Sequence, residues 1–288
     1  MFKADRRDFL KLAAVCSFSQ VAGPDVCQAE PENPPEPVKK PQERLKTGIA
    51  SYTFLKFDLE KTLKMTQQVG ISNISLKDMH FPLDSNAQQT EAIVAAVKAA
   101  KINFYTIGVV YMRSVEEVDK AFKLGSAIGL KTIVGVPNVD LLGQVEKNVK
   151  QYDIKLAIHN HGPRDEVYPV PEAVYEKIKN LDSRIGLCID IGHTQRANVS
   201  PAPEIIKYAD RLYDLHIKDV TEKTVKGTTV EMGRGVIDMT AVVKALYKIK
   251  YPGICSFEYE KDADKPLVGI AESLGYFNGI MDAVRLQG

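Results

Sequence analysis

Short apolar runs typical of β-strands alternate with segments of helical spacing from Thr47 to the C-terminus. In one such segment Leu59, Leu63 and Val69 recur at intervals that place them on one face of a helix. The alternation predicts parallel strands joined by helical crossovers, because parallel neighbours need a long connection. The eight predicted strands span residues 47–54, 71–77, 103–110, 132–137, 155–161, 185–194, 212–220 and 254–260.

The length of this alternating segment favours a closed barrel. It comprises 242 residues, close to the ~250 that are typical of a (β/α)8 barrel. Gly70 and Gly129 stand where two helices are expected to end, as glycine caps do. The segment has no glycine-rich dinucleotide-binding pattern, which argues against an open doubly wound sheet. We therefore expect an α/β fold, a single (β/α)8 TIM barrel over residues 47–288.

The first 46 residues differ from the rest of the chain. Residues 1–29 contain RRDFLK at positions 6–11 and a modest apolar stretch, and they resemble a twin-arginine export signal with cleavage after Ala29. A basic, unstructured start is the alternative interpretation, and Cys16 offers a weaker one, lipoprotein anchoring. Residues 30–46 carry five prolines between Glu30 and Pro41 and predict a semi-rigid linker. We expect an exported, periplasmic protein.

Composition excludes several classes of protein. With 44% apolar and 26% charged residues the chain is typical of a globular protein. A net charge of +1 provides no broad basic field, which argues against a nucleic-acid partner. No apolar run reaches the ~18 residues that a membrane span needs. After removal of the signal only Cys188 and Cys255 remain, and their apolar surroundings predict buried thiols rather than a disulfide.

Histidines and carboxylates gather at the C-terminal ends of the last four predicted strands. In TIM barrels these ends form the active site. Two imidazoles and two carboxylates that converge there suit Mn²⁺, Fe²⁺, Co²⁺ or Zn²⁺ better than Ca²⁺ or Mg²⁺. Each residue alone has a structural alternative, such as a hydrogen-bonded histidine, a turn-capping aspartate or an ion-paired glutamate. The predicted metal ligands are His159, Asp190, His216 and Glu258.

Alternation along a strand adds further residues to the C-terminal mouth of the barrel, where these strand ends meet. His161 shares a face with His159, and Glu260 shares one with Glu258, which requires Asn160 to point the other way. 

The segments around the second strand and before the seventh helix offer weaker signals. Lys77 and His80 offer a cation and an imidazole, for which a solvated strand end and loop packing are the alternatives. The segment Gly233-Arg234-Gly235 favours a turn over an anion cradle, since a lone G-x-G pattern is a weak signal.

Five stretches carry a family likeness: LAIHNHGP, CIDIGHT, DLHIKDV, GRGVIDMTAVVKAL and ICSFEYE. With them the chain from Thr47 onward resembles the xylose isomerase-like superfamily of metal-dependent sugar (phosphate) isomerases and epimerases. The resemblance implies that Asp190, His216 and Glu258 bind the metal. It also implies that His193 contacts a substrate oxygen and that Lys218 or Asp219 lines the pocket.

One departure from the family pattern concerns proton transfer. The family places a glutamate on the fifth strand, where this chain has His159. In the epimerases the paired glutamates bind the metal and move protons on opposite faces of the substrate. With His159 the metal can still bind, but the symmetrical two-carboxylate shuttle is lost. Glu258 then keeps one proton-transfer role, and the second comes from His161, Lys77, Lys218 or Glu260.

These observations lead to three hypotheses about function. The first is a sugar isomerase or epimerase that works through an enediolate on a carbohydrate carbonyl compound, with a divalent metal as Lewis acid and Glu258 or a strand-5 histidine as base. The second, with the same intermediate, is a lyase, dehydratase or hydratase on a keto-sugar or keto-glycoside. The third is a non-catalytic sugar-binding barrel. A phosphodiesterase-type nuclease would need more ligands than the sequence offers.

The site assignment and partners follow from the first hypothesis. We expect one small carbohydrate substrate, and family analogy implies a homo-oligomer, a dimer or tetramer. We assign catalysis to Glu258, His161 and Lys77, and substrate binding to His80, His193, Lys218 and Glu260.

Overall fold

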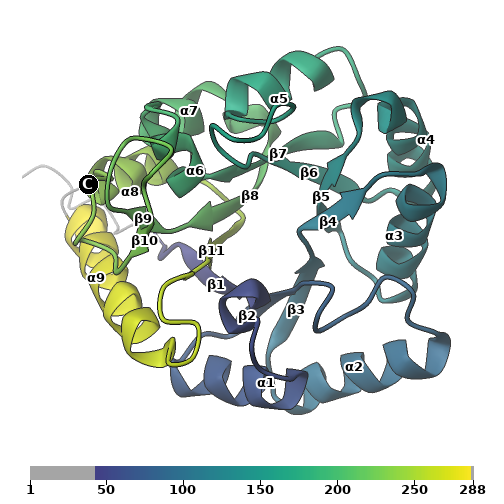
Figure 1. Cartoon of the computed structure of the whole chain (residues 1–288), viewed down its shortest axis with the longest axis horizontal. Helices are drawn as coiled ribbons and strands as arrows, with labels where there is room; N and C mark the ends of the chain where they lie inside the picture. The colour runs from purple at the N-terminus through teal and green to yellow at the C-terminus, as the bar shows by residue number, and fades with distance from the viewer. Residues whose placement is uncertain (1–42, 287–288) are drawn as a thin grey trace, which may run out of the picture. The chain divides into compact units, whose positions relative to one another are not determined.

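The barrel is built from one parallel sheet. The computed structural model describes residues 43–286, so the predicted export signal and nearly all of the predicted linker lie outside the described residues. The strands form a ring with the helices outside it (Figure 1). In ring order they are β3 (Asn103–Ile107), β2 (Asn73–Leu76), β1 (Lys46–Ala50), β11 (Ile254–Phe257), β8 (Leu212–Ile217), β7 (Ile185–Asp190), β6 (Lys155–His159), β5 (Thr132–Pro137) and β4 (Val110–Met112).

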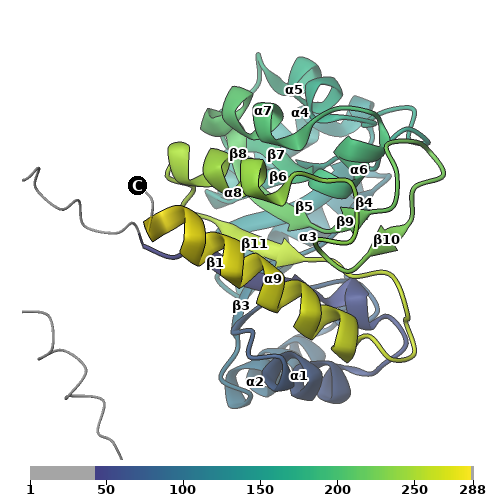
Figure 2. The same cartoon turned by 90° about the vertical axis from the view of Figure 1, so that its left-hand side faces the viewer.

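Helices follow the strands in sequence and cover the outside of the ring. Figure 2 shows the last helix crossing the barrel next to β1 and β11, where Phe277 packs edge-to-face on Phe257 with ring centroids 5.7 Å apart. The helices are α1 (Leu59–Gln68), α2 (Ala87–Ala99), α3 (Val115–Ala127), α4 (Leu142–Tyr152), α5 (Pro171–Ile178), α6 (Ile191–Arg196), α7 (Pro201–Lys207), α8 (Met239–Lys248) and α9 (Leu267–Leu286), with short 3-10 turns at Ser51–Phe54, Val139–Leu141 and Ala209–Arg211. The predicted (β/α)8 barrel is thus confirmed. None of the described helices is long and apolar enough to cross a membrane.

The third predicted strand is divided into two pieces. We predicted one strand over 103–110, but β3 pairs with β2 and β4 pairs with β5, with a break at Gly108 and Val109. A Cβ atom on Gly108 would lie 2.5 Å from the carbonyl oxygen of Val134, and its φ of +151° is one that glycine alone adopts readily. The break lets this strand pair with both neighbours and complete the ring.

Alternation along each strand separates two buried regions. On β6, Leu156 and Ile158 belong to the large cluster under the helices, whereas Ala157 packs with Cys188 in a small cluster inside the barrel. Both Cys188 and Cys255 are buried free thiols, as predicted. Toward the C-terminal ends of the strands, the positions that point into the barrel are polar, as at His159, Asp190 and His216. The reactive side chains are therefore at the C-terminal end of the barrel.

Local signals explain where the helices end. Gly70 (φ +74°) and Gly129 (φ +78°) have the left-handed conformation expected of C-terminal caps. The last four barrel strands end earlier than predicted: β6 at His159, β7 at Asp190, β8 at Ile217 and β11 at Phe257. Residues 191–194, predicted as the end of a strand, belong to α6 instead.

The segment after β8 forms a short hairpin. β9 (Asp219–Val220) pairs antiparallel with β10 (Thr229–Val230), and the loop between them reaches over to α6 through a hydrogen bond from Arg196 to the carbonyl oxygen of Val225, 3.0 Å long.

Candidate metal centre and active site

Four predicted ligands from four neighbouring strands meet inside the barrel mouth. Asp190 on β7 is in register with His216 on β8, and His216 is in register with Ser256, two residues before Glu258. Each of the four side chains offers one ligand atom, and these atoms all lie within 4.8 Å of one another. All four residues are buried: His159, Asp190, His216 and Glu258. We refer to them as the four-strand cluster.

The polar atoms of the four-strand cluster have free coordinating capacity. Both ring nitrogens of His159 and of His216, together with Oδ2 of Asp190, have no hydrogen-bond partner of good geometry among the described residues. Buried polar atoms are normally paired, so such a concentration points to a missing partner. Two imidazoles and two carboxylates form a donor set that suits a divalent transition metal.

Lys218 lies against the carboxylates of this cluster. Its Nζ is 3.0 Å from Oδ2 of Asp190 and 2.6 Å from Oε2 of Glu258, and it also pairs with Glu260. Imidazoles that bind a metal are neutral, and in that state three carboxylates face one ammonium, which leaves two negative charges. A divalent cation supplies the charge that balances them, so the residues present fit such an ion.

Burial and charge act in opposite directions on the pKa values of the carboxylates and the lysine. Burial alone would raise the pKa of Glu258, but Lys218 and His216 outweigh it and hold that pKa well below its usual value. The pKa of Asp190 is lowered in the same way, chiefly by Lys218. Burial would lower the pKa of Lys218, yet the surrounding carboxylates raise it well above its usual value. These three groups are therefore charged at neutral pH.

The pKa values of the two histidines of the cluster shift in opposite directions. Burial lowers the pKa of His159 well below its usual value, so its imidazole is neutral. For His216 burial also acts downward, but Glu258 overcomes it and the pKa is raised. Nδ1 of His216 lies 3.4 Å from Oε2 of Glu258. A metal ion that bound His216 would displace a proton from this pair.

His161 and His193 extend the site beyond the cluster. The ring of His161 is 4.5 Å from that of His159, and its Nε2 lies 3.1 Å from the hydroxyl of Tyr111. The ring of His193 is 5.8 Å from both histidines. Burial lowers the pKa of His161, and it lowers that of His193 to about 4. Both rings are thus neutral at neutral pH.

Lys77 joins the site through aromatic side chains. Its Nζ donates to the carbonyl oxygen of Val109 at 3.2 Å and lies 5.3 Å from the ring centre of Tyr52 and 5.0 Å from that of Tyr111. Burial lowers the pKa of Lys77. Tyr111 therefore contacts both Lys77 and His161, the two catalytic candidates outside the cluster.

His80 lies away from the four-strand cluster and is fully bonded. Its Nδ1 is 2.9 Å from Oγ of Ser51, and its Nε2 lies 2.9 Å from the carbonyl oxygen of Phe57 and 3.0 Å from Oγ1 of Thr62. These contacts tie the second strand's loop to α1 and leave neither ring nitrogen for a ligand. The structure therefore gives His80 the loop-packing role, in place of the substrate contact that the sequence led us to expect.

Asp219 also has a structural position. Its Oδ2 accepts hydrogen bonds from the backbone amides of Gly233 and Gly235, each 3.0 Å long, and its Oδ1 accepts from Val220 and Ile237. The G-R-G turn thus surrounds an anion that belongs to the chain itself. Asp219 shapes the loop before α8 and has no oxygen free for the pocket.

Asn160 points away from the mouth, as alternation requires. Its amide nitrogen donates to Oγ1 of Thr194 and its oxygen accepts from the backbone amide of Asp190. Asn160 therefore fixes the junction between β7 and α6, on which Asp190 depends.

Three residues of the site were not predicted. Arg196 follows His193 by one helical turn on α6, and Tyr111 lies beside His161. Asp214 lies two residues before His216, with Oδ2 3.8 Å from Nε2 of that ring. Burial raises the pKa of Asp214 to about 6. The period-two pattern of strands could have revealed Asp214, whereas Arg196 and Tyr111 gave no comparable signal.

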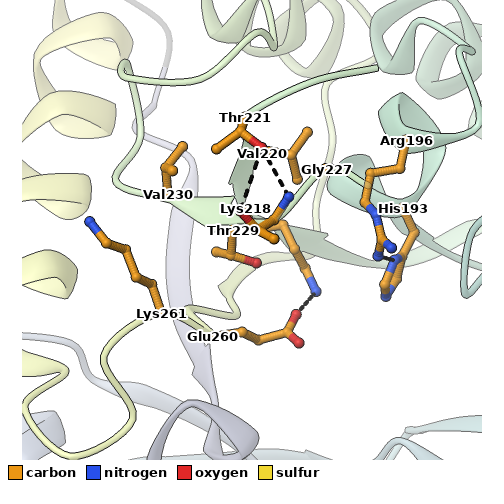
Figure 3. Close-up of a pocket in the computed structure, with 11 residues that line it drawn as sticks. His193, Arg196, Lys218, Val220, Thr221, Gly227, Thr229, Val230, Glu260 and Lys261 are labelled. Carbon is orange, nitrogen blue, oxygen red and sulfur yellow. Dashed lines mark hydrogen bonds and ion pairs between the residues drawn. The ribbon is translucent and has the colours of Figure 1, made fainter. Parts of the chain in front are cut away.

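A cavity of about 590 Å³ opens beside the cluster. Figure 3 shows Lys218 and Glu260 on one side of it and His193 with Arg196 on another. This volume falls within the range of small-molecule sites. Its remaining walls come from the β9–β10 hairpin and from Lys261.

The model of the family described as xylose isomerase-like TIM barrel matches residues 65–280, about three quarters of the chain. The chain belongs to this family. The family match includes all four residues of the four-strand cluster.

Individual relatives are more distant. A mannonate dehydratase of Oceanobacillus iheyensis is 27% identical over 153 residues, which are 46% of this chain and 44% of the relative. The match therefore covers less than half of that enzyme's length. 

Solved structures share the fold. An uncharacterised protein of Parabacteroides distasonis is 27% identical, with 82% of this chain and 98% of that one covered and a TM-score of 0.64. A D-tagatose 3-epimerase-like protein is 17% identical, with 83% and 99% covered and a TM-score of 0.69. At this level of identity the second likeness shows the fold alone.

Proposed function

We propose that this member of the xylose isomerase-like family is a divalent-metal-dependent sugar isomerase or epimerase. It would act through an enediolate on a carbohydrate carbonyl compound. The observation that carries the proposal is the convergence of four buried ligand atoms within 4.8 Å of one another at the mouth of the barrel. The adjoining cavity, large enough for a monosaccharide, supports it.

The metal would be held by His159, Asp190, His216 and Glu258. When bound, a divalent ion supplies Lewis-acid stabilisation of the negative charge that develops on the substrate's oxygens. Lys218 fixes the carboxylate of Glu258 from one side, and Asp190 receives a second anchor from α6. These contacts hold the ligand atoms in place before substrate arrives.

Proton transfer would begin at Glu258. Its carboxylate is ionised, which is the state in which it can accept the proton on the carbon next to the carbonyl group. Return of that proton to the neighbouring carbon gives isomerisation, and its return to the opposite face gives epimerisation. His161 is our candidate for the second proton transfer, because its imidazole is neutral and the hydroxyl of Tyr111 orients it. Lys77 assists from the same side through Tyr111.

Solvent isotope exchange tests this proposal. The metal-loaded protein is incubated in D₂O with a panel of keto- and aldo-sugars, and deuterium next to the carbonyl group is followed by NMR. We expect Glu258→Gln to lower the exchange rate by about 100-fold or more, the usual size of a general-base contribution. Glu272→Gln serves as the control, because this residue forms an exposed pair with Arg234 on the outside of the barrel. Normal exchange by Glu258→Gln would contradict the assignment of the base.

A dehydratase or another lyase is the second candidate. It is supported by the mannonate dehydratase relative and by His159, an imidazole where the epimerases have the second glutamate of their shuttle. In that case the enediolate would expel the substituent on the next carbon. The same NMR experiment separates the two, since a lyase gives an eliminated product and an isomerase gives exchange without elimination. Binding of sugar with neither outcome would favour the non-catalytic barrel.

We further propose that the protein acts after export to the periplasm, on a small carbohydrate and as a homo-oligomer. The proposal rests on the sequence of residues 1–29 and on the family likeness.

A further inference from the structure

The cavity beside the four-strand cluster has two parts. Lys218 and Glu260 line the part that connects it to the cluster, and Arg196 lines another part together with His193 (Figure 3). Arg196 is bonded there to the β9–β10 hairpin through the carbonyl oxygen of Val225. The hairpin contributes the hydroxyl-bearing residues Thr221 and Thr229. A ligand that reached from the cluster into this cavity would therefore bring its far end toward Arg196.

The three cations that line the cavity differ in their partners. Lys218 is paired with the cluster's carboxylates, and Lys261 lies 3.0 Å from Glu231. Arg196 makes no ion pair with any described residue. Its guanidinium donates to Nδ1 of His193 at 3.2 Å and to the carbonyl oxygen of Val225 at 3.0 Å, both neutral acceptors.

The guanidinium also keeps a buried donor unused. Nε of Arg196 is buried and has no hydrogen-bond partner among the described residues. Guanidinium groups bind carboxylates through paired N–H donors. A buried N–H donor without a hydrogen-bond partner costs free energy. The carboxylate of Glu260 does not meet this need, because it is paired with Lys218.

We propose that the cavity binds the carboxylate of a sugar acid, with Arg196 as the residue that recognises it. The substrate class is then a uronate or a related acidic sugar, whose carbonyl end faces the cluster and whose carboxylate lies near Arg196. This inference rests on the proposed function, since it assumes that the cluster holds the carbonyl end.

Arg196 has a second effect, on His193. Because a guanidinium can only donate, Nδ1 of His193 must accept, and the ring proton is on Nε2. His193 therefore offers a fixed N–H donor to the site, as contact with a substrate oxygen requires. Arg196 recognises the acid and positions this donor at the same time.

A matched pair of ligands tests the inference. D-glucuronate and D-glucose differ only in whether the sixth carbon is a carboxylate, and their affinities for the Mn²⁺-loaded full chain can be measured by calorimetry at constant ionic strength. We expect the wild type to bind glucuronate at least tenfold more tightly than glucose, and Arg196→Gln to reduce this ratio to less than twofold. Arg196→Lys should retain part of it. Lys226→Gln, which removes an exposed cation from the same hairpin, should leave the ratio unchanged.

Two results would overturn the inference. One is equal affinity of the wild type for the two ligands, and the other is a preference that persists in Arg196→Gln, which would place the carboxylate on the metal or elsewhere. If Arg196 had only a structural role, Arg196→Gln would lower the affinity for both ligands alike and leave the ratio of the two affinities unchanged. Metal content is measured on the same samples. If the protein binds metal but does not prefer glucuronate to glucose, only the sugar-acid inference is refuted. If it prefers glucuronate but takes up no metal, the proposed function is refuted and Arg196 remains an acid-binding residue.

Discussion

The backbone amide of His193 donates to Oδ1 of Asp190 at 2.7 Å, while Oδ2 of the same carboxylate faces the ring of His159 at 3.3 Å. One oxygen thus caps the N-terminus of α6, and the other belongs to the four-strand cluster. The cap fixes the carboxylate and turns its second oxygen toward the cluster, where Lys218 also lies 3.0 Å from it. Two variants of Asp190 can separate these roles.

Asp190→Asn should retain the cap, because asparagine caps helices as well as aspartate does. It removes the charge of a ligand, so we expect the affinity for Mn²⁺ to fall by about 100-fold or more, beyond the 10–100-fold typical of residues that only support ligands. Asp190→Ala should also lose about 1 kcal/mol of stability through the missing cap. Calorimetric titration with Mn²⁺ and urea unfolding of the metal-free variants measure both effects. Unchanged metal affinity in Asp190→Asn would exclude Asp190 as a ligand.

Lys218→Met should destabilise the metal-free protein. The substitution leaves Asp190, Glu258 and Glu260 without their shared cation, and removal of one partner from a buried ion pair costs about 3–5 kcal/mol. Added Mn²⁺ should raise the melting temperature of the variant more than that of the wild type, since the ion replaces the missing charge. Lys64→Met, which breaks an exposed pair with Glu60, is the control and should change little. An unaltered melting temperature for Lys218→Met would refute this account of the cluster's charge.

His193 should make the metal-free protein less stable in acid. Burial lowers its pKa from 6.5 to about 4, so between these values the unfolded chain binds a proton that the folded protein does not. Stability should therefore fall as the pH decreases from about 6.5 to 4, by up to ~1.4 kcal/mol per pH unit for this one residue. Urea unfolding at several pH values should show a smaller slope for His193→Gln than for the wild type. Equal slopes would mean that His193 titrates normally in the folded state.

The export signal can be tested in a bacterial host. Lysines in place of Arg6 and Arg7 keep the positive charge but remove the arginine pair on which the predicted signal depends. We expect the wild-type chain in the periplasmic fraction, shortened near Ala29, and the double variant unprocessed in the cytoplasm. Export of both chains alike would contradict the twin-arginine prediction.

Much of the fold followed from local patterns in the sequence. Alternating strand and helix patterns predicted the barrel, and parallel strands bring their C-terminal ends to one mouth, which is why His159, Asp190, His216 and Glu258 could be grouped in advance. The broken third strand was not predictable from periodicity, because it depends on the close approach of Gly108 to β5.

Roles that depend on distant partners were harder to predict. His80 and Asp219 follow predicted strands, so the sequence places them near the mouth of the barrel. In the structure the ring nitrogens of His80 are bonded to Ser51 and Phe57, and the carboxylate of Asp219 is bonded to backbone amides of the loop before α8. Lys218 was expected in the pocket, and its contact with three carboxylates became visible only in three dimensions. Such contacts join segments far apart in the chain, about which spacing gives no information.

Elemental analysis of the purified protein tests the central claim most directly. The wild type, after incubation with Mn²⁺, Fe²⁺, Co²⁺ or Zn²⁺ and removal of excess ion, should retain about one equivalent of a divalent metal. His216→Ala, which removes one of the cluster's two imidazoles, should retain far less under the same conditions. Absence of bound metal from the wild type with every one of these ions, or equal retention by the variant, would contradict the four-strand metal centre.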